Sequence, residues 1–137
     1  MLDGLNIKGG NPILTNCTFI GNSADSTGGG MSNEGSNPTL IQCTFKENSA
    51  EQYGGGIENA HNNSRRLSHC IFTGNSAQYG GAVCNYNSNP EFKNCVFSKN
   101  TCVEYGGGMY NFINSNATLL NCTFSGNTRG EEGREQE

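Results

Sequence analysis

The sequence of 137 residues contains no tryptophan, only three prolines and few charged residues. Charged residues make up 15% of the chain and hydrophobic residues 33%, both below the ~25% and ~45% of typical globular domains. No Lys/Arg cluster is larger than the pair Arg65 and Arg66. Nucleic-acid interfaces need a basic stripe, so we expect no nucleic-acid partner.

Long hydrophobic runs are also missing. No stretch approaches the ~20 apolar residues that span a bilayer, so we expect no transmembrane segment. The N-terminal residues 1–5 lack the basic and apolar regions of a signal peptide. Either export is not encoded here, or the chain is part of a longer protein. Apolar residues at helical spacing are absent too, which argues against a helical solenoid.

Glycine and asparagine are abundant instead, and they recur at a fixed interval. Cys-x-Phe tripeptides mark each repeat, and the spacing between successive cysteines is 26, 27, 25 and 27 residues. Each cysteine has a large apolar residue three positions before it and an Asn five positions after it. The five cysteines are Cys17, Cys43, Cys70, Cys95 and Cys122. A repeat of this length indicates a solenoid built from stacked supersecondary units.

Each repeat holds three short apolar segments separated by Gly, Asn, Ser and Thr, which favour turns over helix. This pattern predicts a right-handed parallel β-helix over residues 1–128, with about five rungs of ~26 residues and three short strands per rung. Residues 129–137 are predicted to be a charged, disordered tail.

Equivalent residues of successive rungs should stack at the strand spacing of ~4.8 Å. Cys and Phe of each Cys-x-Phe unit share one face of a strand, and we place both inside, with Leu and Met/Ile/Val ladders beside them. The cysteines are interpreted as a reduced structural ladder, with disulfides as the alternative. Outside this ladder, Cys84 is expected to point outward, and Cys102 to replace an alanine at a turn. No Cys-x-x-Cys pair exists, so no zinc site is expected.

The repeats resemble the Phe-x-x-Asn and Gly-Gly-Ala-(Ile/Leu/Val) motifs of chlamydial polymorphic outer membrane proteins. The Phe-x-x-Asn motif occurs at 19–22, 45–48, 72–75, 97–100 and 124–127, and Gly80-Gly-Ala-Val83 matches the other motif. The chain is also similar to the wider class of pectin-lyase-like surface proteins. This resemblance implies a secreted or cell-surface location and an adhesive passenger or structural stalk.

Three tyrosines provide a candidate binding site. Tyr53, Tyr79 and Tyr105 each precede a glycine pair in successive repeats, so they are predicted to form a column of rings. Such a column either shields the glycine corner or stacks against sugar rings, because an aromatic face is flat and apolar.

The irregular third repeat supplies an alternative polar cluster, consisting of Glu58, His61, Arg65, Arg66 and His69. A polysaccharide lyase or hydrolase needs a base and carboxylates that converge on one groove. The other interpretation is an exposed polar turn. We assign no catalytic residue, no metal ligand and no cofactor from the sequence.

Three functional hypotheses follow. The chain is a non-catalytic surface module, a carbohydrate-binding module, or a domain that degrades polysaccharide. The expected partner is a polysaccharide or a host or cell-surface protein. End-to-end stacking with further rungs or another copy is also expected, because exposed strand edges favour pairing.

Overall fold

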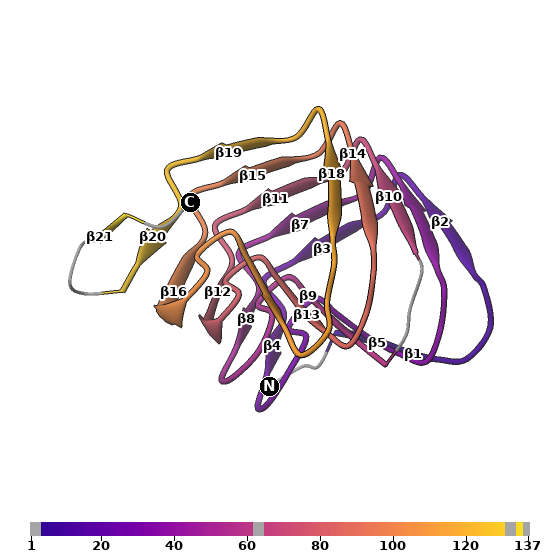
Figure 1. Cartoon of the computed structure of the whole chain (residues 1–137), viewed down its shortest axis with the longest axis horizontal. Coiled ribbons are helices and arrows are strands. Elements are labelled where there is room, and N and C mark those ends of the chain that lie inside the picture. The colour runs from indigo at the N-terminus through magenta and orange to yellow at the C-terminus, as the bar shows by residue number, and fades with distance from the viewer. Residues whose placement is uncertain (1–3, 62–64, 131–133, 136–137) are drawn as a thin grey trace.

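A computed structural model describes residues 4–61, 65–130 and 134–135. In this part of the chain all regular structure is β-strand, arranged in four sheets that we call A to D (Figure 1). Sheet A contains β1 (Leu5–Lys8), β5 (Met31–Glu34), β9 (Ile57–Ala60), β13 (Val83–Tyr86) and β17 (Met109–Phe112). Sheet B contains β2 (Ile13–Thr15), β6 (Thr39–Ile41), β10 (Arg66–Ser68), β14 (Glu91–Lys93) and β18 (Thr118–Leu120). Sheet C contains β3 (Thr18–Ile20), β7 (Thr44–Lys46), β11 (Ile71–Thr73), β15 (Val96–Ser98) and β19 (Thr123–Ser125). Sheet D contains β4 (Ser23–Ala24), β8 (Ser49–Ala50), β12 (Ser76–Tyr79), β16 (Thr101–Tyr105), β20 (Thr128–Arg129) and β21 (Arg134–Glu135).

Every strand from β5 to β20 pairs in parallel with its equivalent in the preceding rung, so the chain coils through the four sheets in turn. Met31, Ile57, Val83 and Met109, for example, are partners in one continuous register of sheet A. The prediction of a parallel β-helix with about five rungs of ~26 residues is confirmed. The prediction of three strands per rung was wrong, because the short segment after each repeated Asn forms a fourth strand.

The corners between sheets are made by single residues in the left-handed region of backbone space. One such residue precedes each repeated cysteine, where sheet B gives way to sheet C: Asn16, Gln42, His69, Asn94 and Asn121. Their φ angles lie between 54° and 57°. Asparagine and glycine tolerate this conformation best, which explains their abundance. Glycine is required at Gly55, where an added Cβ would lie 2.3 Å from the carbonyl oxygen of Ser76.

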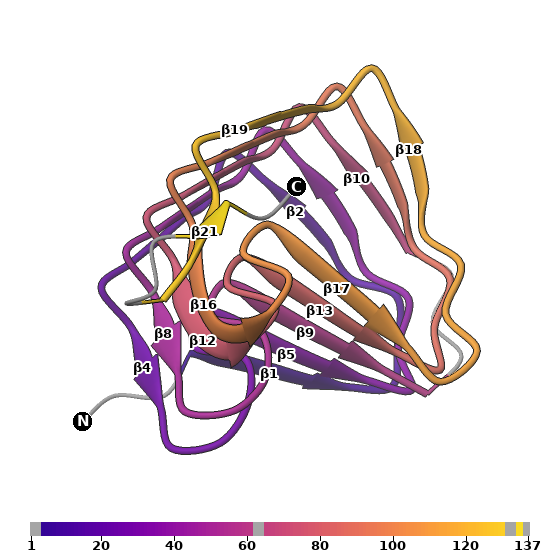
Figure 2. The ribbon, with the colours of Figure 1, turned by 60° about the vertical axis from the view of Figure 1, so that its left-hand side comes forward.

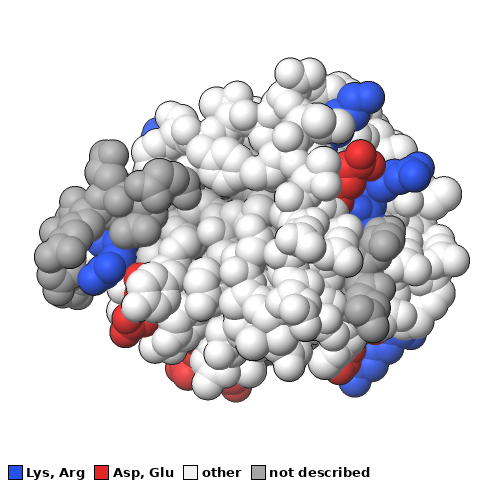
Figure 3. All heavy atoms as spheres, in the orientation of Figure 1, with Lys and Arg blue, Asp and Glu red and all other residues white. Residues whose placement is uncertain are grey.

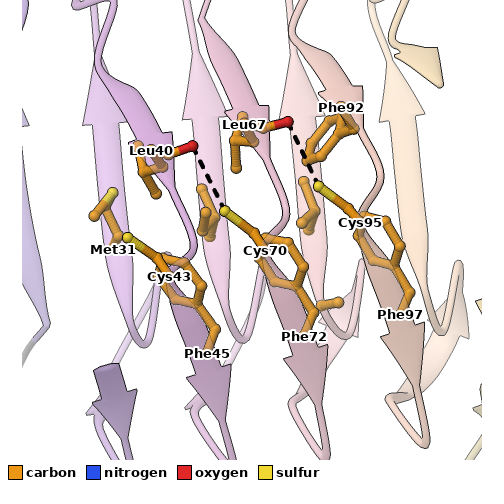
Figure 4. Packing of buried hydrophobic residues seen from close by; sticks show 13 residues of the cluster. Met31, Leu40, Cys43, Phe45, Leu67, Cys70, Phe72, Phe92, Cys95 and Phe97 are labelled. Atoms are coloured by element: carbon orange, nitrogen blue, oxygen red, sulfur yellow. Dashed lines mark hydrogen bonds between the residues drawn. The ribbon is translucent and has the colours of Figure 1, made fainter. Parts of the chain in front are cut away.

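The interior holds the predicted apolar ladders. Phe45, Phe72 and Phe97 are fully buried and stack nearly parallel, with ring centroids 5.0 and 4.8 Å apart. Beside them the cysteines line up in a second row (Figure 4). The Sγ of Cys70 donates a hydrogen bond to the carbonyl of Leu40, and the Sγ of Cys95 donates one to that of Leu67. All seven cysteines are free thiols.

Two buried columns of asparagine join the rungs through their amides. In the column after sheet C, the Nδ2 of Asn48 donates to the Oδ1 of Asn75 at 3.0 Å and also to the carbonyl of Phe19. In the column of sheet A, the Nδ2 of Asn59 donates to the Oδ1 of Asn85 at 2.7 Å. These amides donate hydrogen bonds to acceptors in neighbouring rungs. The bonds offset the free-energy cost of burying polar side chains.

The C-terminal tail departs from the parallel pattern. β21 pairs antiparallel with β20, so that Thr128 faces Glu135 and Arg129 faces Arg134. Residues 131–133 and 136–137 of the predicted tail lie outside the described part. The described residues include no helix long and apolar enough to cross a membrane.

Candidate functional site

A pocket of about 460 Å³ lies at the corner where sheet D leads into sheet A. Figure 2 shows these connections side by side, next to the strands of sheet A. The lining residues come from the connections, from the outward face of β5, β9, β13 and β17, and from the corner residue after β9: Thr27, Ser32, Glu34, Tyr53, Glu58, Ala60, His61, Cys84, Tyr86 and Phe112.

Three outward columns build this corner. The first runs along the connections and comprises Thr27, Tyr53, Tyr79 and Tyr105. The second and third run along sheet A: Asn6, Ser32, Glu58, Cys84 and Tyr110, and then Lys8, Glu34, Ala60, Tyr86 and Phe112. The places on β5 and β9, and Thr27 in the connections, hold small or acidic side chains, whereas most of the places on β13 and β17 and those of Tyr79 and Tyr105 hold aromatic ones. The pocket therefore opens at β5 and β9 and ends at the Phe112 ring.

The predicted tyrosine column exists, but it belongs to a larger aromatic cluster. Tyr79 stacks on Tyr53 at 5.3 Å and on Tyr105 at 6.1 Å between ring centroids. Tyr110 stacks on Tyr79 at 5.5 Å, and Phe112 stacks on Tyr53 at the same distance. Only Tyr53 of the three predicted tyrosines lines the pocket. Sheet A contributes Tyr110 and Phe112, which the sequence did not single out.

Glu58 lines the pocket from β9, in register with Ser32 of β5. The Oγ of Ser32 donates a hydrogen bond of 3.1 Å to its Oε1. Burial raises the pKa of the Glu58 carboxyl above its usual range, and the nearby Glu34 carboxylate adds to this rise. The Ser32 hydrogen bond and the positive charges of Arg65 and His61 oppose it more weakly.

A second carboxylate and a histidine lie at the rim. The Nε2 of His61 is 3.6 Å from the Oε2 of Glu34, and both side chains are about half exposed. The His61 ring also meets the Tyr86 ring edge-on, with centroids 5.4 Å apart. Glu34 was not among the predicted site residues. The sequence did offer a signal for it. Glu34 lies diagonally across from Glu58 in the register of β5 and β9, and side chains at diagonal positions of adjacent strands are close enough to interact.

The polar cluster predicted from the third repeat is divided by the fold. Glu58 and His61 meet at the pocket, as described above. Arg66 is exposed on β10 and lies 3.6 Å from Glu91 of β14. His69 forms the corner between sheets B and C, where its ring nitrogen is 3.5 Å from Asn94. The five residues do not line one groove, because Glu58 lies on sheet A, Arg66 lies on sheet B and His69 lies at the corner between sheets B and C.

Arg65 is buried, with 1% of its surface exposed. It precedes Arg66, which is in register with Thr39 and Glu91, so it takes the place that Pro38 and Pro90 hold in the adjacent rungs. Its Nη2 donates to the carbonyl of Ser36 at 3.1 Å, whereas its Nε and Nη1 have no hydrogen-bond partner among the described residues. Burial lowers the pKa of the guanidinium to about 9, so it is still cationic at neutral pH and attracts Glu58.

The two cysteines outside the ladder are both buried. Cys84 occupies the outward column of sheet A, as expected, but it is fully covered instead of exposed. The aromatic rings beside it explain the difference, and burial raises the pKa of its thiol. Cys102 pairs with Ala77, as the predicted replacement of an alanine requires. Among the described residues no group of three or more His, Cys, Asp or Glu side chains could hold a metal ion.

Comparison with known protein families defines the class of this protein. The family described as right handed beta helix region matches residues 2–132. The chain belongs to this family, which agrees with the coil through four parallel sheets and gives its hand. No curated protein and no solved structure matches the chain.

Proposed function

We propose that this chain is a non-catalytic, secreted or cell-surface module with an adhesin-like role, and that it binds carbohydrate in the corner pocket. One observation carries the proposal. Rings of Tyr53, Tyr86 and Phe112 line a single cavity together with the carboxyl groups of Glu34 and Glu58. Sugar rings present C–H faces that stack on aromatic rings, and hydroxyl groups that donate to carboxylates.

The size and setting of the pocket support this function. Its volume of about 460 Å³ falls in the range of ~300–1,000 Å³ found for ligand sites. The face of the molecule shown in Figure 3 carries few charged atoms, and they gather toward its margins. The sequence motifs described above resemble those of surface passenger regions. A regular scaffold with a pocket lined by aromatic and acidic side chains suits a module that displays a binding site.

The test is retention on immobilised polysaccharides, followed by calorimetry with an oligosaccharide of any retained class. Tyr53→Ala removes a ring from the pocket, and we expect it to lower affinity at least tenfold. Tyr105→Ala is the matched control, because Tyr105 belongs to the same column but lies outside the pocket. Its affinity should stay within about twofold of the wild type. Equal losses in both variants, or no retention on any glycan, would overturn the proposal.

Cleavage of a glycosidic bond is the second candidate, and two carboxyl groups in one pocket favour it. The raised pKa of Glu58 suits an acid that protonates the leaving oxygen, while Glu34 would assist water as a base. Release of new reducing ends that Glu58→Gln abolishes would replace the non-catalytic function with this one. Unchanged oligosaccharides after long incubation would eliminate it.

A further inference from the structure

The pocket has an uneven charge. Two carboxyl groups, Glu34 and Glu58, line it, and the described lining residues include no Lys or Arg. His61 is the one basic side chain among them, and it sits at the rim beside Glu34. Arg65 acts on Glu58 from the interior but does not line the cavity. The lining thus carries two carboxyl groups against one histidine, with Lys8 of β1 in register with Glu34 outside it, and this balance favours cations and opposes uronates.

Glu58 has unused capacity to accept hydrogen bonds. Its Oε1 accepts from Ser32, and within the described residues its Oε2 accepts from none. Because the carboxyl is largely withdrawn from water, a donor supplied by a ligand would be worth more here than at the surface. A charged N–H donor would give the strongest such bond, since hydrogen bonds between two ionised groups are shorter and stronger than neutral ones.

The aromatic wall offers a complementary surface. Tyr53 stacks with Tyr79 and Phe112, but Thr27 holds the next place of its column toward the N-terminus. Within this column, the described residue before Tyr53 therefore places no ring beside it. Tyr86 and Phe112 add two more rings to the lining. Aromatic faces attract cations through the ring quadrupole, most strongly where water is excluded.

We propose that the pocket selects a protonated amino sugar. The ligand's ammonium group would donate to Glu58, with Glu34 as the second anion, and its C–H face would stack on Tyr53. This inference rests on the proposed carbohydrate binding and narrows it to one class of sugar. An acidic pocket of this kind would not bind uronic acid polymers, which are the ligands expected of a pectin-lyase-like protein.

The experiment compares three tetrasaccharides by calorimetry at pH 6, two of them β-1,4-linked and the uronate α-1,4-linked as it is in pectin. They are the tetramers of glucosamine, N-acetylglucosamine and galacturonic acid, each titrated into the full chain. We expect the glucosamine tetramer to bind at least tenfold more tightly than its N-acetylated form, and the uronate tetramer not to bind. Equal affinity for the first two, or preference for the uronate, would overturn the amino-sugar inference and leave carbohydrate binding intact. Failure of all three, together with failure of the wider polysaccharide panel, would overturn both.

Three variants distinguish binding in the pocket from a general attraction of the ligand to the negative charge of the protein surface. Glu58→Gln keeps the shape of the side chain, and we expect it to abolish most of the preference for the glucosamine tetramer. Glu34→Gln should produce a smaller loss, because its carboxylate is half exposed. Glu51→Gln removes the same charge from an exposed turn and is the matched control. If Glu51→Gln and Glu58→Gln weaken binding equally, the attraction is general and the inference is wrong.

Discussion

The two halves of the corner beside sheet A share one backbone and differ in their outward side chains. At β5 and β9, Ser32, Glu34 and Ala60 leave a pocket open. At β13 and β17 three of the four equivalent places hold rings, and the fourth holds Cys84. The register is continuous from one half to the other, so the difference arises from the side chains alone.

This difference shows that in a β-helix the residues that stabilise the fold and the residues that can form a binding site occupy different positions. Inward places are constrained, because each residue must stack on its equivalents in both neighbouring rungs. Outward places carry no such constraint, so a few substitutions convert a closed corner into a pocket. Adding a ring to the open half, or removing one from the closed half, tests this separation.

Closing the open half should have the largest effect. Ala60 is in register with Tyr86, so Ala60→Phe would extend the rings of Tyr86 and Phe112 by one rung. The added ring would occupy the pocket, and we expect glycan affinity to fall at least 100-fold while the fold is kept. Calorimetry and thermal unfolding measure the two effects. Thr123→Phe, which adds a ring to the exposed face of sheet C, is the control. Wild-type affinity in Ala60→Phe would show that the ligand binds elsewhere.

Opening the closed half should have a smaller effect. Phe112→Ala removes the ring at the end of the pocket, at a cost of about 1–2 kcal/mol in unfolding free energy, because this ring is only partly buried. Access to the covered Cys84 thiol should follow. We expect maleimide to modify Cys84 at least tenfold faster than in the wild type, as measured by peptide mass spectrometry. Buried Cys70 serves as the internal control. Rapid modification of Cys70 as well would indicate unfolding instead of a local opening.

The sequence was sufficient to predict the interior. Cys43, Phe45 and Asn48 recur because their neighbours above and below are the same residues, so periodicity alone identified the ladders. The fourth strand was missed because it is as short as two residues and holds only one inward side chain, such as Ala24 or Ala50. A segment so short has no alternation of apolar and polar residues to detect.

The pocket was predicted only in part, and the reason is geometric. Tyr53, Glu58 and His61 were identified, because equivalent or unusual residues stand out in an aligned repeat. Phe112 was missed because its ring stacks on Tyr53 from two rungs away. The spacing of residues within one repeat does not indicate a contact between rungs that are not neighbours. Arg65 could not be separated from Arg66 by composition, although one side chain is buried and the other is 80% exposed.

The smallest predicted effect concerns how much the buried carboxyl group of Glu58 lowers the free energy of unfolding. Its pKa is raised in the folded chain, chiefly by burial and then by Glu34, against the opposing influence of Ser32, Arg65 and His61. Folding therefore favours the protonated carboxyl. The contribution of Glu58 to stability is fully present below its unfolded pKa, and it is lost as pH rises through the higher folded pKa.

Glu58→Gln removes this titration while keeping a side chain that accepts from Ser32. We expect the wild type and the variant to have similar melting temperatures near pH 4, and the variant to become the more stable as pH rises toward 8. Thermal unfolding at intervals of pH measures the difference, with Glu51→Gln as the control that should show no such trend. A difference that does not change with pH would mean that Glu58 ionises as freely in the folded chain as in water. The pocket would then lack the desolvated carboxyl on which its selectivity for amino sugars depends.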